Sequence, residues 1–171
     1  MDEVVASTTV HVPPEEVFDF LSDFPGYAKY STHLDSVEQF GEGGEGTEYR
    51  LHLSWWKVSH TVTTKVMKMT PPEEIHWETQ SAVDADGRWI VEPLETDTDR
   101  TETRVTLLVR YDPNSARLGG LDVPRFVSTG WIIRRVKPLI EPEAERIVGR
   151  IVRELEGSPR QIDLTIKTRQ A

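Results

Sequence analysis

The sequence predicts an α+β protein: a curved antiparallel β-sheet wrapped around a long C-terminal α-helix, with two short helices after the first strand. Two observations predict this fold class. Apolar and polar residues alternate with a period of two through most of residues 34–111, which is typical of strands that bury one face. Apolar residues recur at every third or fourth position from Ile132 to Leu155, which is typical of an amphipathic helix.

The first strand and the two short helices are predicted near the N-terminus. Residues 4–12 are rich in β-branched side chains, which favour a strand. Residues 13–16, Pro-Pro-Glu-Glu, favour the start of a helix, because proline is tolerated in the first turn and carboxylates there face the positive end of the helix dipole. Residues 24–26, Phe-Pro-Gly, interrupt that helix, and one further turn is expected over residues 27–30.

Six further strands are expected at residues 34–40, 47–56, 58–66, 74–81, 88–93 and 101–111. Breakers separate several of them: the glycine-rich residues 41–46, the prolines at 71 and 72, and the Asp-Ala-Asp-Gly turn signal at 84–87. Joined as antiparallel hairpins, these strands bring all their apolar side chains to one face. The expected cross-strand partners are Leu53 with His60, Leu51 with Val62, Trp77 with Val91, and Val91 with Val105.

The C-terminal helix is expected to cover this apolar face. Pro138 and Pro142 should bend it or split it near residue 141, because a proline inside a helix removes a backbone hydrogen bond. Gly157 should end it. We therefore expect one domain over residues 1–157 and a loosely held tail over residues 158–171.

Composition excludes several kinds of site and location. The 171 residues include no cysteine, which excludes a disulfide scaffold, a thiol nucleophile and cysteine-ligated zinc. No apolar run approaches 18 residues and the first residues are acidic, so neither a membrane span nor a signal peptide is expected. The expected location is the cytoplasm.

The chain is acidic, with 29 Asp and Glu residues against 20 Lys and Arg and a net charge of −9. Nucleic acid is not expected as a partner, because its binding needs a basic footprint. Residues 101–171 carry 9 acidic and 13 basic side chains. A solvated helix face with Glu–Arg pairs is favoured for them over transient contact with an anionic membrane. The acidic total and the 14 Arg against 6 Lys are typical of a halophile's proteins.

No motif predicts a metal or a cofactor. Residues 41–46 match the G-x-G-x-x-G pattern of dinucleotide-binding loops, but a strand rather than a helix follows and two glutamates would repel phosphate, so a hairpin turn is favoured. The five histidines lack the H-x-x-x-H spacing of helical zinc sites. No catalytic residue is assigned, and His60 is the candidate if the protein is an enzyme.

The apolar face of the predicted sheet also carries polar side chains. For His60, between Val58 and Val62, a buried neutral imidazole satisfied by a hydroxyl group is favoured over a ligand contact. The hydroxyl-bearing residues of this face are Tyr49, Thr64, Thr79 and Tyr111. An unpaired buried polar group costs about 1–3 kcal/mol, so a dry core rarely collects such residues. Composition alone therefore favours a partly wet pocket and a plain core equally.

The order of elements and three segments resemble a known superfamily. Residues 10–24 resemble the opening of the START-like (SRPBCC) superfamily, which includes the polyketide cyclase/dehydrase family, the coenzyme Q-binding START-type family and the birch-pollen-allergen group. Residues 87–93 resemble its W-x-hydrophobic-x-P strand, and residues 103–106 resemble the entry to its last strand. The likeness covers about residues 3–156 and implies the helix-grip fold.

This resemblance implies a deep cavity between the curved sheet and the C-terminal helix, which takes up a lipid, a quinone or a polyketide-like molecule. The residues to which we give a pocket-lining role on this basis are Leu51, Leu53, Trp55, His60, Val62, Trp77, Trp89, Leu107, Val109 and Tyr111. The sequence departs from the family in the Gly- and Pro-bearing connection 112–127 and in the prolines of the helix, both of which bear on the cavity mouth.

Three functions follow as alternatives. The first is a noncatalytic carrier of a hydrophobic small molecule, without a cofactor, in which residues 112–127 gate entry. The second is an aromatase/cyclase or dehydratase acting on a polyketide-like substrate, with His60 as general acid or base, although no carboxylate on the covered face tunes that imidazole. The third is a protein-interaction module.

Overall fold

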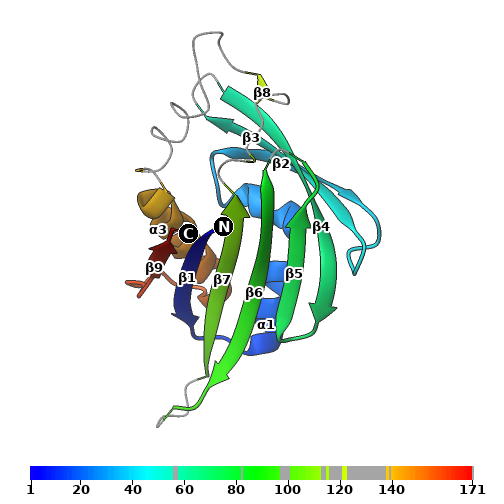
Figure 1. The fold of residues 1–171 in the computed structure, drawn as a ribbon. Helices are drawn as coiled ribbons and strands as arrows, with labels where there is room; N and C mark the ends of the chain where they lie inside the picture. Colours follow the sequence, from blue (N-terminus) through cyan, green and yellow to red (C-terminus); the bar gives the residue numbers. More distant parts are fainter. Residues whose placement is uncertain are drawn as a thin grey trace.

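One antiparallel sheet forms the frame of the molecule (Figure 1). This computed structural model describes residues 1–55, 58–81, 83–96, 101–112, 115, 121–122, 138 and 140–170. The sheet order is β2-β3-β4-β5-β6-β7-β1-β9, and β8 pairs with β4 outside this path. The strands are β1 (Asp2–Val10), β2 (Leu34–Phe40), β3 (Glu48–Trp55), β4 (Val58–Thr70), β5 (Glu74–Thr79), β6 (Asp84–Leu94), β7 (Glu102–Asp112), β8 (Leu121–Asp122) and β9 (Thr165–Arg169).

Helices lie on one face and at one side of the sheet. They are α1 (Pro14–Ser22), the 3-10 helix η1 (Phe24–Lys29) and α3 (Ile140–Glu156). In Figure 1, α1 lies behind the central strands, and α3 lies at the side of the sheet where β1 and β9 are. The predicted fold class is confirmed: a curved antiparallel sheet, two short helices after the first strand and a C-terminal helix.

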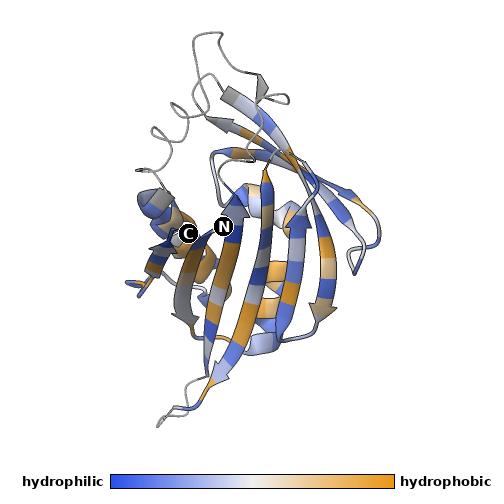
Figure 2. Cartoon of the chain, in the orientation of Figure 1, coloured by the Kyte–Doolittle hydropathy of each residue, from blue (hydrophilic) through white to orange (hydrophobic). Residues whose placement is uncertain are grey.

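Strand alternation gives the sheet an inner face, defined here as the face of Tyr49, Val66, Ile75 and Val91. These four side chains are 0% to 3% exposed and pack in one core with Val17, Phe18 and Leu21 of α1 and Val152 of α3. Figure 2 shows the matching alternation of hydrophobic and hydrophilic residues along the central strands. The core therefore lies between the inner face and the helices.

The two short helices form where the sequence predicts them. The N–H groups of Glu16 and Val17 bond to the Pro13 carbonyl at 3.1 and 3.2 Å, which begins α1 directly after the prolines. The helix ends before Asp23, and η1 supplies the expected further turn. Residues 41–46 form the loop between β2 and β3, which confirms a hairpin turn in place of a dinucleotide-binding loop.

Three of the four expected cross-strand pairs are confirmed: Leu53–His60, Leu51–Val62 and Val91–Val105. The fourth is wrong, because Trp77 lies opposite Gly87 rather than Val91. The turn comes before Asp84: the Thr79 hydroxyl accepts the Ala85 N–H at 2.9 Å and donates to the Val83 carbonyl at 2.5 Å. Residues 84–87, expected as a turn, are therefore the start of β6. Because the register shift is an even number of residues, the expected faces are unchanged.

β4 is longer than predicted and contains a bulge. It runs to Thr70, and its register against β5 shifts between Val66 and Lys68. The extra residue leaves Met67 42% exposed and returns Met69 to the inner face, opposite Ile75.

The C-terminal end of α3 lies where the sequence predicts it, just before Gly157. Gly157, with a φ of +80°, follows its last residue, and the Gly157 N–H bonds to the Arg153 carbonyl at 2.9 Å. At the other end Pro142 stands in the first turn, where a proline is tolerated. The residues before it, 123–137 and 139, lie outside the described part of the chain, and with them most of the region where a bend was expected.

The expectation of a loosely held tail is wrong for Thr165–Arg169, which form β9 and pair with β1. The carboxylate of Asp163, just before β9, binds the end of β1. It accepts hydrogen bonds from the Thr8 hydroxyl at 3.3 Å and from the Thr9 N–H at 3.4 Å. Pairing with β9 satisfies backbone groups of β1 that would otherwise form an open sheet edge. The domain boundary at residue 157 stays a prediction.

Candidate functional site

Five consecutive strands, β3 to β7, carry the predicted pocket residues on the inner face. Leu51 lies opposite Val62, and Leu53 lies opposite His60. Trp89 lies opposite Leu107. Strand alternation places Trp77, Val109 and Tyr111 on the same face. The fold therefore brings the predicted pocket residues together on one face of the sheet. The side chain of Trp55 is the exception, because it lies outside the described part of the chain. The ligand-contact role of all ten residues stays a prediction.

Burial divides the inner face into two parts. Next to α1 lies the core defined above, where side chains are almost fully buried. Farther along the same strands the side chains are only half-buried. We call this part the half-buried region; its members are Leu51, Leu53, His60, Val62, Trp77, Trp89, Leu107, Val109 and Tyr111. A bound apolar molecule would cover the surface that these side chains leave exposed.

A group of aromatic side chains lies where η1 meets the inner face. The ring of Phe24 is centred 4.6 Å from that of Tyr49 and 5.1 Å from that of Tyr27. The Tyr27 hydroxyl donates to the Leu21 carbonyl and shares a side-chain hydrogen bond with Trp89. Burial raises the pKa of Tyr27 well above its ordinary value.

Tyr49 is the fully buried member of this group. It is 1% exposed, and its hydroxyl has no hydrogen-bond partner among the described residues. Burial raises the pKa of this phenol, and the Asp23 carboxylate raises it further, so the group is neutral at physiological pH. Neither Tyr27 nor Tyr49 is in the predicted pocket set. Alternation along residues 47–56 placed Tyr49 among the hydroxyl-bearing residues of the apolar face, whereas Tyr27 lies on η1 and carries no periodic signal.

His60 lies at the end of the half-buried region that is farthest along β4 from Val66. Its backbone pairs with Leu53 of β3 on one side and with Leu121 of β8 on the other. Its side chain is half-buried rather than fully buried. The connection 112–127, predicted to gate entry, lies outside the described residues except for positions 112, 115 and 121–122.

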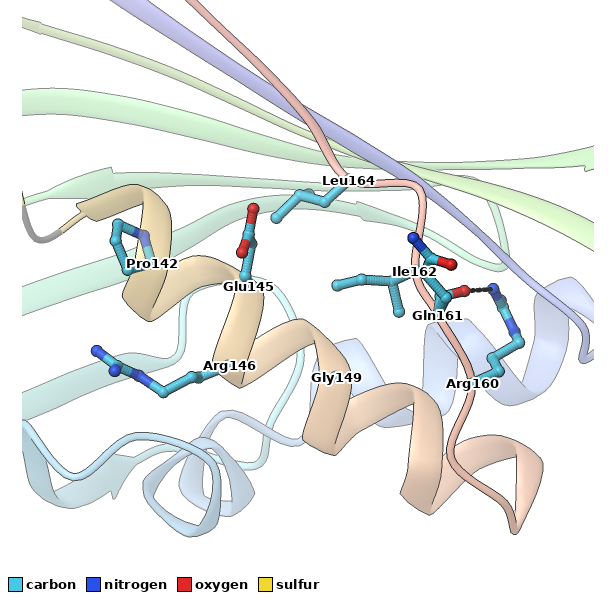
Figure 3. Close-up of a pocket in the computed structure, with 8 residues that line it drawn as sticks. All are labelled: Pro142, Glu145, Arg146, Gly149, Arg160, Gln161, Ile162 and Leu164. Carbon is cyan, nitrogen blue, oxygen red and sulfur yellow. Dashed lines mark hydrogen bonds between the residues drawn. The ribbon is translucent and has the colours of Figure 1, made fainter.

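A separate hollow lies between α3 and the extended residues 160–164 (Figure 3). It has a volume of about 590 Å³ and is lined by Pro142, Glu145, Arg146, Gly149, Arg160, Gln161, Ile162 and Leu164. Its two cations already have partners: Arg146 pairs with Glu143 at 2.9 Å, and Arg160 pairs with Glu156 at 2.8 Å. No predicted pocket residue lines this hollow, so it is distinct from the half-buried region.

The part of the chain that the structure describes contains neither a candidate metal site nor a helix suited to cross a membrane. No three His, Asp or Glu side chains gather there in a way that could hold a metal ion. Within the same ranges, no helix combines the length and apolar character that crossing a membrane requires.

Comparison with known proteins identifies the family. Residues 1–152 match the family described as polyketide cyclase / dehydrase and lipid transport. No curated protein matches the sequence. Among solved structures, the chain is similar to Zhui aromatase/cyclase from Streptomyces sp. R1128, with 20% sequence identity and a TM-score of 0.63 over 91% of this chain and 94% of that one.

Two other solved structures share the fold. A START superfamily protein from Mycobacterium smegmatis has 18% identity and a TM-score of 0.58, over 91% of this chain and 99% of that one. Ara h 8.0201 has 16% identity and a TM-score of 0.52, over 89% of this chain and 99% of that one. At these identities the likeness is one of fold. Because the family match spans most of the sequence, the chain belongs to the polyketide cyclase/dehydrase and lipid transport family.

Proposed function

We propose that this protein binds and carries a hydrophobic small molecule, such as a lipid, a quinone or a polyketide-like compound, on the half-buried region of the inner face. One observation carries the proposal: large apolar and aromatic side chains gather there without being fully covered. Covering their exposed area with an apolar ligand releases roughly 25 cal/mol per Å². This contribution favours binding without any covalent chemistry.

The polar members of this region suit the same role. His60 and Tyr111 each bring a hydrogen-bonding group to an otherwise apolar surface. Sites for small molecules usually combine an apolar lining with a few such groups, which fix the orientation of the ligand. The family description, which includes lipid transport, agrees with a carrier.

Native mass spectrometry of the purified protein, followed by organic extraction, tests this proposal. We expect a copurified hydrophobic molecule, or a rise in Tm with members of a panel of fatty acids, quinones and aromatic polyketides. Recovery of nothing, together with no rise in Tm across the panel, would contradict the proposal.

A matched pair of variants then locates the site. Leu107→Gln places a polar group in the half-buried region. Thr106→Gln changes the preceding residue, whose side chain lies on the outer face of the sheet. Burying a leucine side chain against a ligand contributes about 1.5–3 kcal/mol to the binding free energy. Losing this contribution weakens binding by roughly 10-fold or more. We expect this loss for Leu107→Gln only. Equal losses in both variants would place the ligand elsewhere.

A second candidate function is catalysis as an aromatase/cyclase or dehydratase. The observation that favours it is the half-buried imidazole of His60 on the inner face, where it could serve as general acid or base for a bound polyketide-like substrate. Incubation with such a substrate, followed by mass spectrometry, separates the two functions. A carrier returns the molecule unchanged, whereas a dehydratase releases water in an amount that His60→Gln reduces.

A further inference from the structure

Tyr49 combines almost complete burial with an unused polar atom on the inner face. Its hydroxyl has no partner among the described residues, although the side chain is only 1% exposed. A buried donor without a partner is costly, so such a group in a native protein needs an explanation, such as a bound water, an ion or a functional role.

The position of this hydroxyl is fixed from two sides. The backbone of Tyr49 is paired in the sheet, with Gln39 of β2 and Thr64 of β4. Its ring packs at 4.6 Å against Phe24, which is itself 7% exposed. The phenol therefore cannot turn to solvent without breaking the core, and its hydroxyl needs a partner that comes to it.

The neighbouring phenol does not supply this partner. The Tyr27 hydroxyl donates a hydrogen bond to the Leu21 carbonyl, and its oxygen accepts one from the indole N–H of Trp89. The rings of Tyr27 and Tyr49 both pack against Phe24. Leu51 of the half-buried region lies two residues after Tyr49 on the same face of β3, so the unused Tyr49 donor lies beside the inner end of that region.

We infer that the Tyr49 hydroxyl donates a hydrogen bond to a neutral carbonyl oxygen at the inner end of the bound ligand. This inference rests on the proposed function and narrows its ligand class to hydrophobic ketones and quinones. The Asp23 carboxylate makes the surroundings of Tyr49 unfavourable to negative charge. A fatty-acid carboxylate is therefore a poorer occupant of this position than a neutral carbonyl.

Two matched probes test the hydrogen bond: menadione (2-methyl-1,4-naphthoquinone) and 2-methylnaphthalene, which share a carbon skeleton and differ in the two carbonyl groups. Tyr49→Phe removes only the hydroxyl. We expect this variant to bind menadione about 5- to 10-fold more weakly than the unaltered protein does. Its affinity for 2-methylnaphthalene should stay unchanged. Isothermal titration calorimetry measures both.

The results of these titrations test the role of Tyr49 separately from the proposed function. Equal changes for the two probes overturn the role of Tyr49 and leave hydrophobic binding intact. Failure of both probes to bind the unaltered protein while fatty acids of the panel bind overturns the inference alone, whereas failure of the whole panel contradicts the proposed function as well. A third probe, 2-naphthoate at pH 7, should bind more weakly than menadione, and tighter binding of this anion would overturn the preference for a neutral carbonyl.

The stability of the ligand-free protein gives an independent readout, with Tyr27→Phe as the matched control. Tyr49→Phe removes an unpaired buried group and should raise Tm by about 2–4 °C. Tyr27→Phe removes a hydroxyl that is already bonded and should lower Tm. If Tyr49→Phe lowers Tm as well, a buried water already pairs its hydroxyl, and the inference is wrong.

Discussion

The indole of Trp77 lies directly over Gly87: a Cβ placed on Gly87 would stand 2.1 Å from Cζ2 and 2.3 Å from Cε2 of that ring. The two residues face each other across β5 and β6. Glycine generally weakens a strand, but here it leaves room for a large aromatic side chain of the half-buried region.

Gly87→Ala should therefore destabilise the protein by about 1–3 kcal/mol, because the indole has to move to admit a methyl group. Gly149→Ala is the matched control, since a Cβ there would meet nothing within 4 Å. Removing this glycine from the interior of α3 should stabilise the protein by up to about 1 kcal/mol. Chemical denaturation measures both. Effects of the same sign would show that Trp77 is not held over Gly87.

The Glu156 carboxylate connects the end of α3 to β1. It accepts the His11 N–H at 3.0 Å and two N–H groups of Arg160 at 2.8 and 3.0 Å, while Arg160 also donates to the Thr9 carbonyl at 2.7 Å. Burial opposes ionisation of this carboxyl, but the bonds from Arg160 and His11 outweigh it and lower the pKa of Glu156.

This lowered pKa predicts a loss of stability in acid. A carboxyl whose pKa is lower in the folded state stabilises the fold above its unfolded pKa, near 4.3, and loses this contribution as pH falls through the folded value. We expect the free energy of unfolding to fall between about pH 5 and pH 3. Glu156→Gln should be less stable at pH 7 and show a shallower decline. Urea denaturation across this range measures the effect, with the exposed Glu154→Gln as control. An unchanged pH profile in Glu156→Gln would rule out this role.

The pairing of β9 with β1 predicts unequal effects on stability at two adjacent residues. Ile166 is half-buried and pairs with Ala6, whereas Lys167 is exposed and pairs with Val5. Ile166→Asp should destabilise the protein by about 1–3 kcal/mol, since it places a charge against the core side of the sheet. Lys167→Asp should change stability by less than about 0.5 kcal/mol. If thermal denaturation gave the same result for both, β9 would not be part of the stable sheet.

Local patterns in the sequence were sufficient for most of the sheet. Alternation is a property of each strand by itself, so β2 was predicted with its observed bounds, and the Leu51–Val62 pair followed from a tight turn. The register of β5 against β6 failed for a non-local reason. Residues 84–87 have the composition of a turn, but Gly87 is required by an indole that comes from another strand.

The remaining differences also depend on distant parts of the chain. β9 is a short segment with little alternation of its own, and it forms because β1, from the other end of the sequence, offers an unpaired edge. Periodicity found the inner-face positions of the candidate site. It could not find the pairing of Tyr27 with Trp89, because that contact depends on how η1 docks against the sheet.

The position of β1 between β7 and β9 also determines when β1 can pair during synthesis. Val5 emerges early from the ribosome, yet its two partners, Leu108 and Lys167, emerge much later. Long-range strand pairing of this kind slows folding and leaves nascent chains prone to aggregation. The nascent β1 segment therefore stays without a strand partner until β7 has been synthesised.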